Sequence, residues 1–296
     1  VRGCAFPTKS SMSILKIAIQ KSGRLSEKSL QLLKECGIHL PSGDRKLKTE
    51  ASNFPVEVLY LRDDDIPQYV EQGVVDVGIL GENEVWEKGK NVVEVQKLGF
   101  AGCRLSLAIP KDEHYAGPEY FQHKRVATSY PRILSRFFEE RGISATVEEI
   151  GGSVEIAPGI GLADGIFDIV STGSTLLMNG LKEVEVVVRS QAVLISHPEL
   201  SEDKRLILNK LLFRIHAVQN ASANKYILLN APNSAIPDIA RVLPGMKSPT
   251  VLPLVDEGWS SVHSVIPEEA FWEVIDELKR LGAQGILVIP IEKMVL

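Results

Sequence analysis

The chain alternates between apolar and amphipathic segments along its first two thirds. Ile14–Gln20 and Val56–Leu61 are apolar and rich in β-branched residues, which is typical of strands. Ser26–Cys36 spaces its apolar residues at helical intervals, and Gly37 follows as a helix stop. This alternation predicts an α/β fold with mostly parallel strands. By the same criteria we expect strands at Val74–Leu80, Val92–Leu98, Arg104–Ile109, Arg125–Thr128, Thr146–Ile150, Phe167–Ser171, Val184–Val188 and Arg189–Ile195, and helices at Ile66–Gln72, Ile133–Arg141 and Val154–Ala157.

The carboxy-terminal part has a different order of elements. The pattern predicts strand, helix, two strands, helix and strand at Tyr226–Leu229, Ala235–Leu243, Thr250–Val255, Ser261–Ile266, Glu268–Leu281 and Gly285–Pro290. This βαββαβ order is that of a ferredoxin-like domain. Domains of this kind often bind effectors or assemble through their sheets, although the fold alone decides no function. Glu202–Asn220 is the expected helical connection to it.

The first eleven residues, 1–11, carry no hydrophobic period, and Met12 precedes the first strand. We interpret them as a leader or an added remnant. They lack the apolar core of a secretory signal, although an organelle-targeting leader would also fit.

Composition limits the partners more than it identifies them. Lys plus Arg is 33 and Asp plus Glu is 38, which gives a net charge of −5 and no global attraction for nucleic acid or anionic lipid. No apolar run is long enough to span a membrane. The three cysteines, Cys4, Cys36 and Cys103, form no metal or redox motif. We therefore expect a cytoplasmic protein that binds any anionic ligand through a local site.

Two turns have the chemistry of such a site. Gln20–Leu25 lies between a strand and a helix, and combines Lys21 and Arg24 with free N–H groups at the helix start. The alternative is a solvated turn in which Ser22 caps the helix. Asp168–Thr175 follows another strand and gathers four hydroxyl groups around Gly173, which suits a phosphate. Here the alternative is an ordinary capped helix start, and there is no Walker lysine.

Other motifs are weaker. Gly159–Gly165 has a spacing one residue too long for a dinucleotide-binding fingerprint. Asp63–Asp65 resembles a magnesium site, but capping of the helix that begins at Ile66 explains it better. Thr128–Arg132 is a further strand-to-helix turn with the same ambiguity, and the histidines show no zinc spacing.

A longer stretch carries a resemblance to a known family. Glu155, Gly161, Ala163, Ile166, Asp168, Thr172, Gly173, Thr175 and Leu176 resemble the signature of ATP phosphoribosyltransferase, the first enzyme of histidine biosynthesis. Other segments similar to that family are Ile17–Leu25, Leu61–Pro67, Val75–Asn83, Cys103–Ala108, Ala127–Pro131 and Ile289–Met294. Together they cover nearly the whole chain from Met12.

The resemblance implies a reaction in which N1 of ATP attacks C1′ of 5-phosphoribosyl 1-diphosphate, with Mg²⁺ on the diphosphate. It implies that Ser171, Thr172, Gly173, Ser174 and Thr175 hold the 5-phosphate, with Glu155 and Asp168 on the phosphoribosyl group. It also implies that Lys21, Ser22, Gly23, Arg24, Asp65 and Arg104 bind ATP or the diphosphate, and that Asp168, Lys21 and Arg24 are the catalytic residues. No protein side chain is assigned to the metal. Such a reaction needs positioning and electrostatic stabilisation more than a nucleophile or a base.

The same resemblance implies an architecture. The catalytic part has two lobes like those of a periplasmic binding protein, here residues 12–107 with 190–220, and residues 108–189. The chain is expected to cross between them near Leu105–Pro110 and Val188–Ile195. Residues 224–296 match the regulatory domain of the long form, which implies inhibition by histidine and a dimer or hexamer of identical chains. Within that domain we expect the effector near Asp256 and His263.

Two rival hypotheses stay open at this stage. A solute-binding or sensor protein also has two α/β lobes, but the missing export signal and the two anion turns disfavour it. A regulatory paralogue without activity would bind histidine only, and the intact motif residues argue against it.

Overall fold

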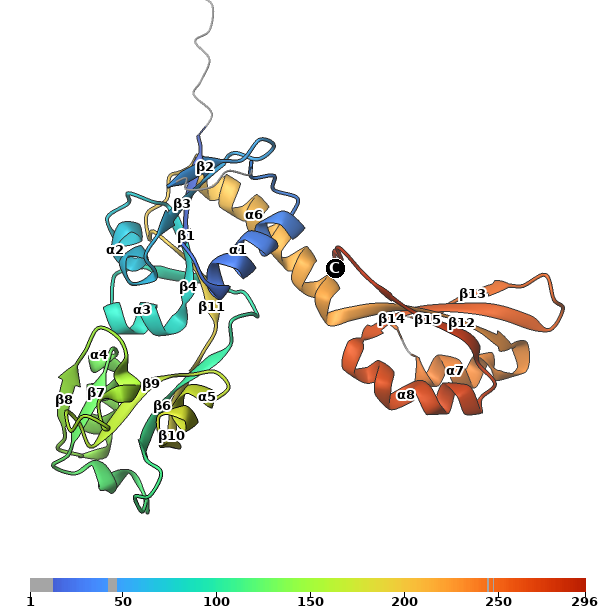
Figure 1. Ribbon diagram of the computed structural model, residues 1–296. Coiled ribbons are helices and arrows are strands. Elements are labelled where there is room, and N and C mark those ends of the chain that lie inside the picture. Colours follow the sequence, from blue (N-terminus) through green and yellow to red (C-terminus); the bar gives the residue numbers. More distant parts are fainter. Residues whose placement is uncertain (1–12, 42–46, 244, 247) are drawn as a thin grey trace, which may run out of the picture. The chain divides into compact units, whose positions relative to one another are not determined.

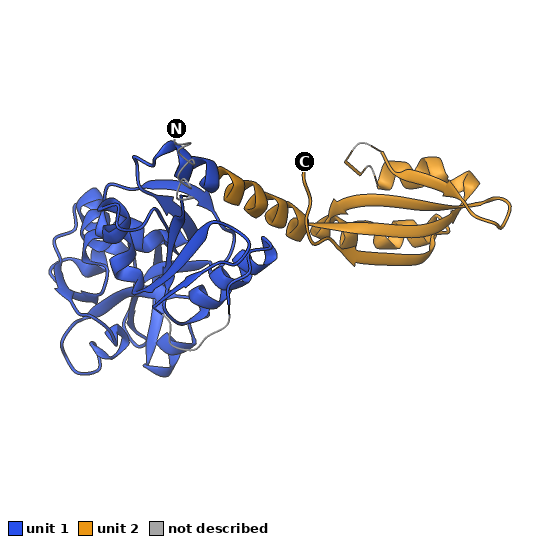
Figure 2. Ribbon diagram, turned by 90° about the horizontal axis from the view of Figure 1, so that it is seen from above, with its two compact units in different colours: residues 1–208 blue, residues 209–296 orange. Residues whose placement is uncertain are grey.

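A computed structural model describes residues 13–41, 47–243, 245–246 and 248–296. The expected leader at 1–11 lies outside these residues. The chain forms two compact units, one that ends at Leu208 and one that covers Asn209–Leu296 (Figure 2). Helix α6 (Glu202–Ala223) contains the boundary between them. No helix of the described residues is both long and apolar enough to cross a membrane.

A six-stranded sheet forms the first half of unit 1, which we call lobe I. Its strand order is β2-β3-β1-β4-β11-β5, and β1 pairs in parallel with both β3 and β4 (Figure 1). Both faces of β1 are buried, since Ile17, Ala18 and Ile19 are all inaccessible to solvent. The elements of lobe I are β1 (Leu15–Gln20), α1 (Arg24–Glu35), β2 (Lys48–Glu50), β3 (Val56–Leu61), η1 (Asp63–Asp65), α2 (Ile66–Glu71), β4 (Val77–Gly81), α3 (Glu82–Lys88), β5 (Val93–Lys97) and β11 (Ala192–Ser196).

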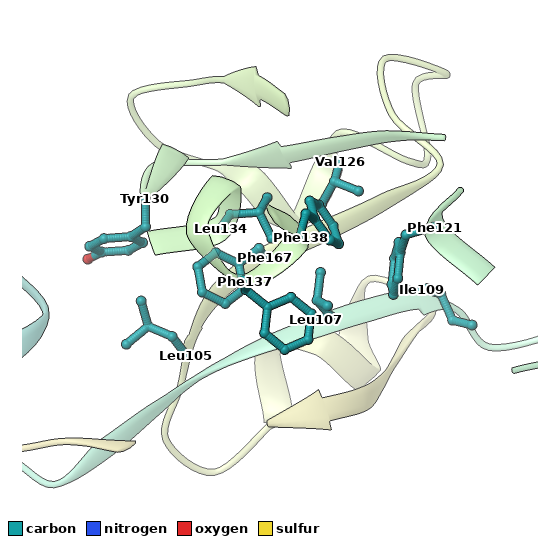
Figure 3. Close-up of a cluster of buried hydrophobic side chains, with 10 residues drawn as sticks. All are labelled: Leu105, Leu107, Ile109, Phe121, Val126, Tyr130, Leu134, Phe137, Phe138 and Phe167. Carbon is teal, nitrogen blue, oxygen red and sulfur yellow. The ribbon is translucent and has the colours of Figure 1, made fainter. Parts of the chain in front are cut away.

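A five-stranded sheet of order β10-β6-β9-β7-β8 forms lobe II. Strand β9 alternates between the two faces of this sheet. Phe167 packs on one face with Leu107, Phe137 and Phe138 under α4 (Figure 3), and Ile166 packs on the other face under α5 and η3. The elements of lobe II are β6 (Cys103–Pro110), η2 (Pro118–Phe121), β7 (Arg125–Thr128), α4 (Pro131–Arg141), β8 (Thr146–Glu149), η3 (Val154–Ile156), β9 (Gly165–Val170), α5 (Ser174–Met178) and β10 (Leu181–Ser190).

The chain crosses between the two sheets twice, as expected of this two-lobe fold. The return crossing, between β10 and β11, lies within the predicted range Val188–Ile195. The first crossing precedes Cys103, earlier than the predicted Leu105–Pro110, because the whole of β6 pairs with β9 and β10. The expectation of mostly parallel strands was wrong, because the strands that flank the crossings, β6, β10 and β11, all pair antiparallel.

Unit 2 is a ferredoxin-like domain, which confirms the βαββαβ prediction. Its sheet has the order β13-β14-β12-β15 with all pairs antiparallel. Helices α7 and α8 cover one face of this sheet over a core that includes Ile227, Leu229 and Val262 (Figure 1). The elements are β12 (Asn224–Pro232), η4 (Asn233–Ala235), α7 (Ile236–Val242), β13 (Thr250–Pro253), β14 (Trp259–Pro267), α8 (Glu268–Arg280) and β15 (Gln284–Pro290).

Helix α3 of lobe I binds the first turn of α4 in lobe II. The Glu87 carboxylate accepts hydrogen bonds from the backbone N–H groups of Arg132, at 2.9 Å, and Ile133, at 3.0 Å. These N–H groups lie at the start of a helix and have no partner within it. The negative charge of Glu87 also lies at the positive end of the α4 dipole. Glu87 therefore caps α4 from the other lobe.

A second contact between the lobes involves the buried side chain of Asn83. Ser190 Oγ donates to Asn83 Oδ1 at 2.8 Å, and the Asn83 backbone N–H donates to Ser190 Oγ at 3.1 Å. The amide of Asn83 donates to Tyr130 Oη at 3.3 Å and to Glu84 Oε1 at 3.1 Å. Each of these groups is buried, so the network fixes the junction between the lobes.

Glu84 is the ionisable member of this network and is 8% exposed. Burial raises the pKa of its carboxyl to about 7, and the negative charge of Asp63 raises it further, whereas a hydrogen bond with Tyr130 opposes the shift. The folded protein therefore binds a proton at Glu84 across a pH range in which an unfolded chain has lost it.

We expect Glu84→Gln to stabilise the protein in a pH-dependent way. Between about pH 5 and pH 8 the wild type must either keep its proton or bury a charge, so it loses stability as pH rises. Glutamine retains the acceptor oxygen and does not titrate. The unfolding temperature of the variant, relative to that of the wild type, should therefore increase by about 5 °C from the lower to the higher of these pH values. The exposed Glu139→Gln on α4 is the matched control, and thermal unfolding at several pH values measures both. An equal difference at all pH values would show that Glu84 titrates as an ordinary carboxyl.

Candidate active site

The first anion turn lies where the parallel strands of lobe I end. Lys21 to Arg24 follow β1, Asp63 follows β3, and Glu84 follows β4. Parallel strands end at one edge of a sheet, where α/β proteins bind ligands. A hydrogen bond of 3.2 Å from Gln20 Nε2 to Asp63 Oδ2 joins the first two strand ends.

This turn presents two cations, Lys21 and Arg24, without a side-chain partner among the residues that the structure describes. Gly23 adopts φ +93° directly before α1, and no side chain caps this helix, so the interpretation of Ser22 as a cap was wrong. Lys21 and Arg24 are exposed, and neither side chain forms an ion pair or hydrogen bond with another residue that the structure describes. Their charges are therefore free for a ligand.

The three consecutive acids of lobe I, Asp63–Asp65, make different contacts. Arg62 makes two hydrogen bonds to Asp64, at 3.1 and 3.2 Å, and Asp63 accepts from Gln20. Asp65 precedes α2 but makes no side-chain capping bond, so the capping interpretation was wrong for it. Among the described residues no group of three or more histidine, cysteine or acidic side chains could hold a metal ion.

The second anion turn follows β9 in lobe II. Gly173 adopts φ +83° as the N-cap residue of α5 and has no side chain to cap the helix, whereas Thr172 Oγ1 accepts a long hydrogen bond of 3.5 Å from the Ser174 backbone N–H. Thr172 Oγ1 and Ser174 Oγ lie 3.0 Å apart, and both residues are exposed, like Ser171 and Thr175. The loop therefore offers several hydroxyl donors to solvent, and the left-handed conformation of its turn favours glycine.

Asp168 lies on the face of β9 that turns away from α4. Burial raises the pKa of its carboxyl to about 6, a hydrogen bond from the backbone N–H of Ile169 lowers it, and the nearby charge of Glu155 in η3 raises it. Glu155, predicted from the signature, and Asp168, predicted from both the turn and the signature, therefore lie close enough for the charge of Glu155 to act on Asp168.

Tyr130 links the acids of the two lobes. Tyr130 follows β7, which is parallel to β9. It therefore lies at the same edge of the sheet as Ser171–Thr175, the loop after β9, which we call the hydroxyl loop. Burial raises the pKa of its phenol, and so do the charges of Glu84, Asp168 and Asp63. Two of these acids belong to lobe I and one to lobe II. The strand ends of both lobes therefore meet around Tyr130.

Arg104 was predicted to bind phosphates directly, but the structure gives it partners within the protein. Its Nε and Nη2 donate to Glu183 at 2.5 and 2.6 Å, and its Nη1 donates to the carbonyl of Ser171 at 3.0 Å. Arg104 and Glu183 are 79 residues apart in the sequence. Sequence patterns therefore carry no signal for this pair.

The proposed effector residues are not neighbours within unit 2. Asp256 is exposed in the turn between β13 and β14, whereas His263 lies opposite Thr250 on the same hairpin. His263 shares hydrogen bonds with Tyr226 Oη at 2.7 Å and Ser261 Oγ at 3.1 Å.

The structure also shows features that sequence reasoning missed. Glu84 and Glu183 were not among the predicted residues. The only available signal for Glu84 was its position after a buried parallel strand. A hollow of about 960 Å³ between α3 and α4 is lined by residues such as Trp86, Arg136 and Val188, and by none of the predicted site residues.

Comparison with known proteins identifies the family. The pattern of the HisG family, ATP phosphoribosyltransferase, matches residues 62–217, and that of the HisG C-terminal domain matches residues 221–293. An ATP phosphoribosyltransferase of Cytophaga hutchinsonii is 58% identical over 96% of this chain and 99% of its own length. One from Parabacteroides distasonis is 59% identical over 95% of this chain and its whole length.

A solved structure gives the same result for the fold. The ATP phosphoribosyl transferase (HisG:HisZ) complex from Thermotoga maritima contains a chain that is 30% identical, with a TM-score of 0.60. The match covers 69% of this chain and 96% of the other. The two anion turns, the acids between them and the ferredoxin-like unit thus occur in a chain that belongs to the ATP phosphoribosyltransferase family.

Proposed function

We propose that the protein transfers the 5-phosphoribosyl group from 5-phosphoribosyl 1-diphosphate to N1 of ATP. The products are 1-(5-phosphoribosyl)-ATP and diphosphate, and the reaction is the first step of histidine biosynthesis. The main support is that acids beside the two anion turns, Asp63 and Glu84 of lobe I and Asp168 of lobe II, all act on Tyr130, in a chain that is 58% identical to a named relative over nearly its full length. Each substrate is a polyanion, and each lobe provides one turn for it.

The residues divide the substrates between the lobes. The exposed hydroxyls of Ser171, Thr172, Ser174 and Thr175, together with the N–H groups around Gly173, suit the 5-phosphate of the donor. Asp168 and Glu155 suit the ribose hydroxyls. Lys21 and Arg24, at the turn with Ser22 and Gly23, neutralise diphosphate or triphosphate oxygens. Mg²⁺ enters with the diphosphate as part of the substrate, and of the triplet Asp63–Asp65 the exposed Asp65 has no side-chain partner among the described residues and is available to it.

The proposed reaction needs no strong base, and none of the roles proposed above is that of a strong base. Positive charge develops on the ribose as the bond to diphosphate breaks, and the nucleophile is a neutral ring nitrogen. Asp168 is ionised at neutral pH even with its raised pKa of about 6. Because its surroundings are partly buried, its negative charge stabilises that positive charge more strongly than it would in water. Lys21 and Arg24 stabilise the leaving diphosphate in turn.

The direct test is formation of the product from fresh substrates. We expect ATP, 5-phosphoribosyl 1-diphosphate and Mg²⁺ to give phosphoribosyl-ATP, followed by its ultraviolet absorbance, with release of diphosphate. In the same assay we expect added histidine to inhibit, through unit 2. Absence of turnover would exclude the proposed reaction, and binding of histidine without turnover would favour a regulatory protein instead.

Single substitutions test the assignment of the loop and of Asp168. Thr172→Ala removes one hydroxyl donor, and Asp168→Asn removes the charge while it keeps the shape. Each should lower kcat/KM by at least about tenfold, which corresponds to about 1.4 kcal/mol of transition-state stabilisation. Thr146→Ala, at an exposed position on β8 of the same sheet, is the control. Unchanged kinetics in the first two variants would remove these residues from the mechanism.

A homo-oligomer is the second part of the proposal, and the sheet of unit 2 supports it. Leu287 and Ile289 of β15 pair in register with Leu228 and Tyr226 of β12, whose side chains point away from the helix-covered core. Leu287 is 53% and Ile289 41% exposed. We propose that a second copy of the chain covers this apolar face.

Substitution on that face should weaken assembly. We expect the wild type to sediment as a species larger than one 32.5 kDa chain, and Leu287→Glu to shift it towards smaller species, because a charge would then be buried in the interface. Trp272→Glu on α8, an exposed apolar position on the helix-covered side, is the control. Analytical ultracentrifugation measures all three, and an unchanged mass for Leu287→Glu would exclude this face.

A further inference from the structure

Arg104 is enclosed by partners that use both sides of its guanidinium. Glu183 accepts from Nε at 2.5 Å and from Nη2 at 2.6 Å, which is the bidentate arrangement of a strong ion pair. Ser106 Oγ donates to the same carboxylate at 2.7 Å, on the oxygen Oε1 that also accepts from Arg104 Nε, and so adds to the bonds that fix Glu183. The third contact of the guanidinium is the carbonyl of Ser171, at 3.0 Å from Nη1.

The charge of this pair is balanced within the protein. Hydrogen bonding to Arg104 lowers the pKa of the Glu183 carboxyl, so Glu183 stays ionised. The side chains of Arg104 and Glu183 are 26% and 23% exposed. Arg104 therefore differs from Lys21 and Arg24, which are exposed and lack such a partner among the described residues. A cation neutralised in this way contributes little attraction for a phosphate.

The contact with Ser171 lies at the first residue of the hydroxyl loop. Strand β9 ends at Val170, which is paired in register with Arg104 on β6. The loop then turns at Gly173, and the Thr172 hydroxyl contacts the Ser174 hydroxyl and, at 3.5 Å, accepts from the Ser174 backbone N–H. The guanidinium thus fixes the carbonyl at the point where the chain leaves the rigid sheet.

We propose that Arg104 and Glu183 are positioning residues, which hold the Ser171 carbonyl and so orient the loop that receives the phosphate of the phosphoribosyl donor. The proposal rests on the proposed function of that loop. A loop held in its binding conformation loses less entropy when ligand binds. Removal of either member of the pair should therefore weaken binding of the donor and leave binding of ATP nearly unchanged.

The two single variants distinguish positioning from direct contact. If the pair positions the loop, Arg104→Gln and Glu183→Gln each raise KM for 5-phosphoribosyl 1-diphosphate about tenfold, with KM for ATP within twofold. The double variant is then no worse than either single one, because both act through the same contact. If Arg104 bound phosphate directly, Glu183→Gln would release its charge and leave or lower that KM, which would overturn the proposal.

Arg104→Lys provides a second, milder comparison. Lysine keeps the charge but cannot donate in a fork to Glu183 and also reach the Ser171 carbonyl. Positioning predicts that it resembles Arg104→Gln, and near wild-type affinity for the donor would contradict this. Arg125→Gln is the matched control, because Arg125 also contacts an acid, Asp164, and a loop carbonyl, that of Gly161, but at the start of β7. It should leave both KM values unchanged.

Two measurements separate this proposal from the proposed function. The wild type is assayed first, and absence of turnover would overturn the function itself. Calorimetric titration with ribose 5-phosphate then reads the loop without turnover, and the Arg104 and Glu183 variants should bind it about tenfold more weakly than the wild type and Arg125→Gln. An active wild type whose Arg104 and Glu183 variants bind ribose 5-phosphate normally would overturn only the positioning role.

Discussion

The contacts that α3 makes with lobe II determine the geometry of the whole candidate site. One anion turn belongs to each sheet, so the separation of the two turns depends on how the two lobes are joined. Glu87 holds the start of α4, and Asn83 holds Ser190, so the backbone of lobe II is tied to lobe I on two elements. Hydrogen bonds to a charged group contribute about 1.5–3 kcal/mol each, and those of Glu87 also gain from the dipole of α4. A short helix without a conventional apolar stripe thus joins the lobe that carries one anion turn to the lobe that carries the other.

In the candidate site the cations Lys21 and Arg24 are exposed, whereas the acids Glu84 and Asp168 are fully or partly buried. The chain has a net charge of −5, yet its proposed substrates are polyanions. Lys21 and Arg24 are exposed and so can meet phosphates without first losing a protein partner. Glu84 is buried and Asp168 partly so, and burial raises the pKa of both, which limits the negative charge near the phosphates. Under the proposed function, attraction for the substrates is therefore local, and Asp168 keeps its negative charge at neutral pH beside the proposed site of the ribose.

Much of the fold could be predicted because apolar periodicity decides it. β3 was expected at Val56–Leu61 and has those bounds, and β7 at Arg125–Thr128 likewise. Helix α3 was missed because it buries the polar residues Glu82, Asn83 and Glu84, which give no apolar stripe. Strand β2 was missed because three residues are too few for a period. Local patterns identify what each element buries, but polar contacts between distant elements have no such pattern.

The same limit applies to the predicted site residues. Sequence shows the charge of an arginine but not the partner that the fold brings to it. Arg24 and Arg104 look alike as letters near strand ends, and both were assigned to phosphates. In the structure Arg24 has no side-chain partner among the described residues, whereas Arg104 lies between Glu183 and the Ser171 carbonyl. Because a neutralised guanidinium attracts phosphate weakly but fixes geometry well, the two arginines differ in role. In the proposed reaction, Arg24 supplies charge to the diphosphate, and Arg104 fixes the shape of the loop proposed to hold the donor.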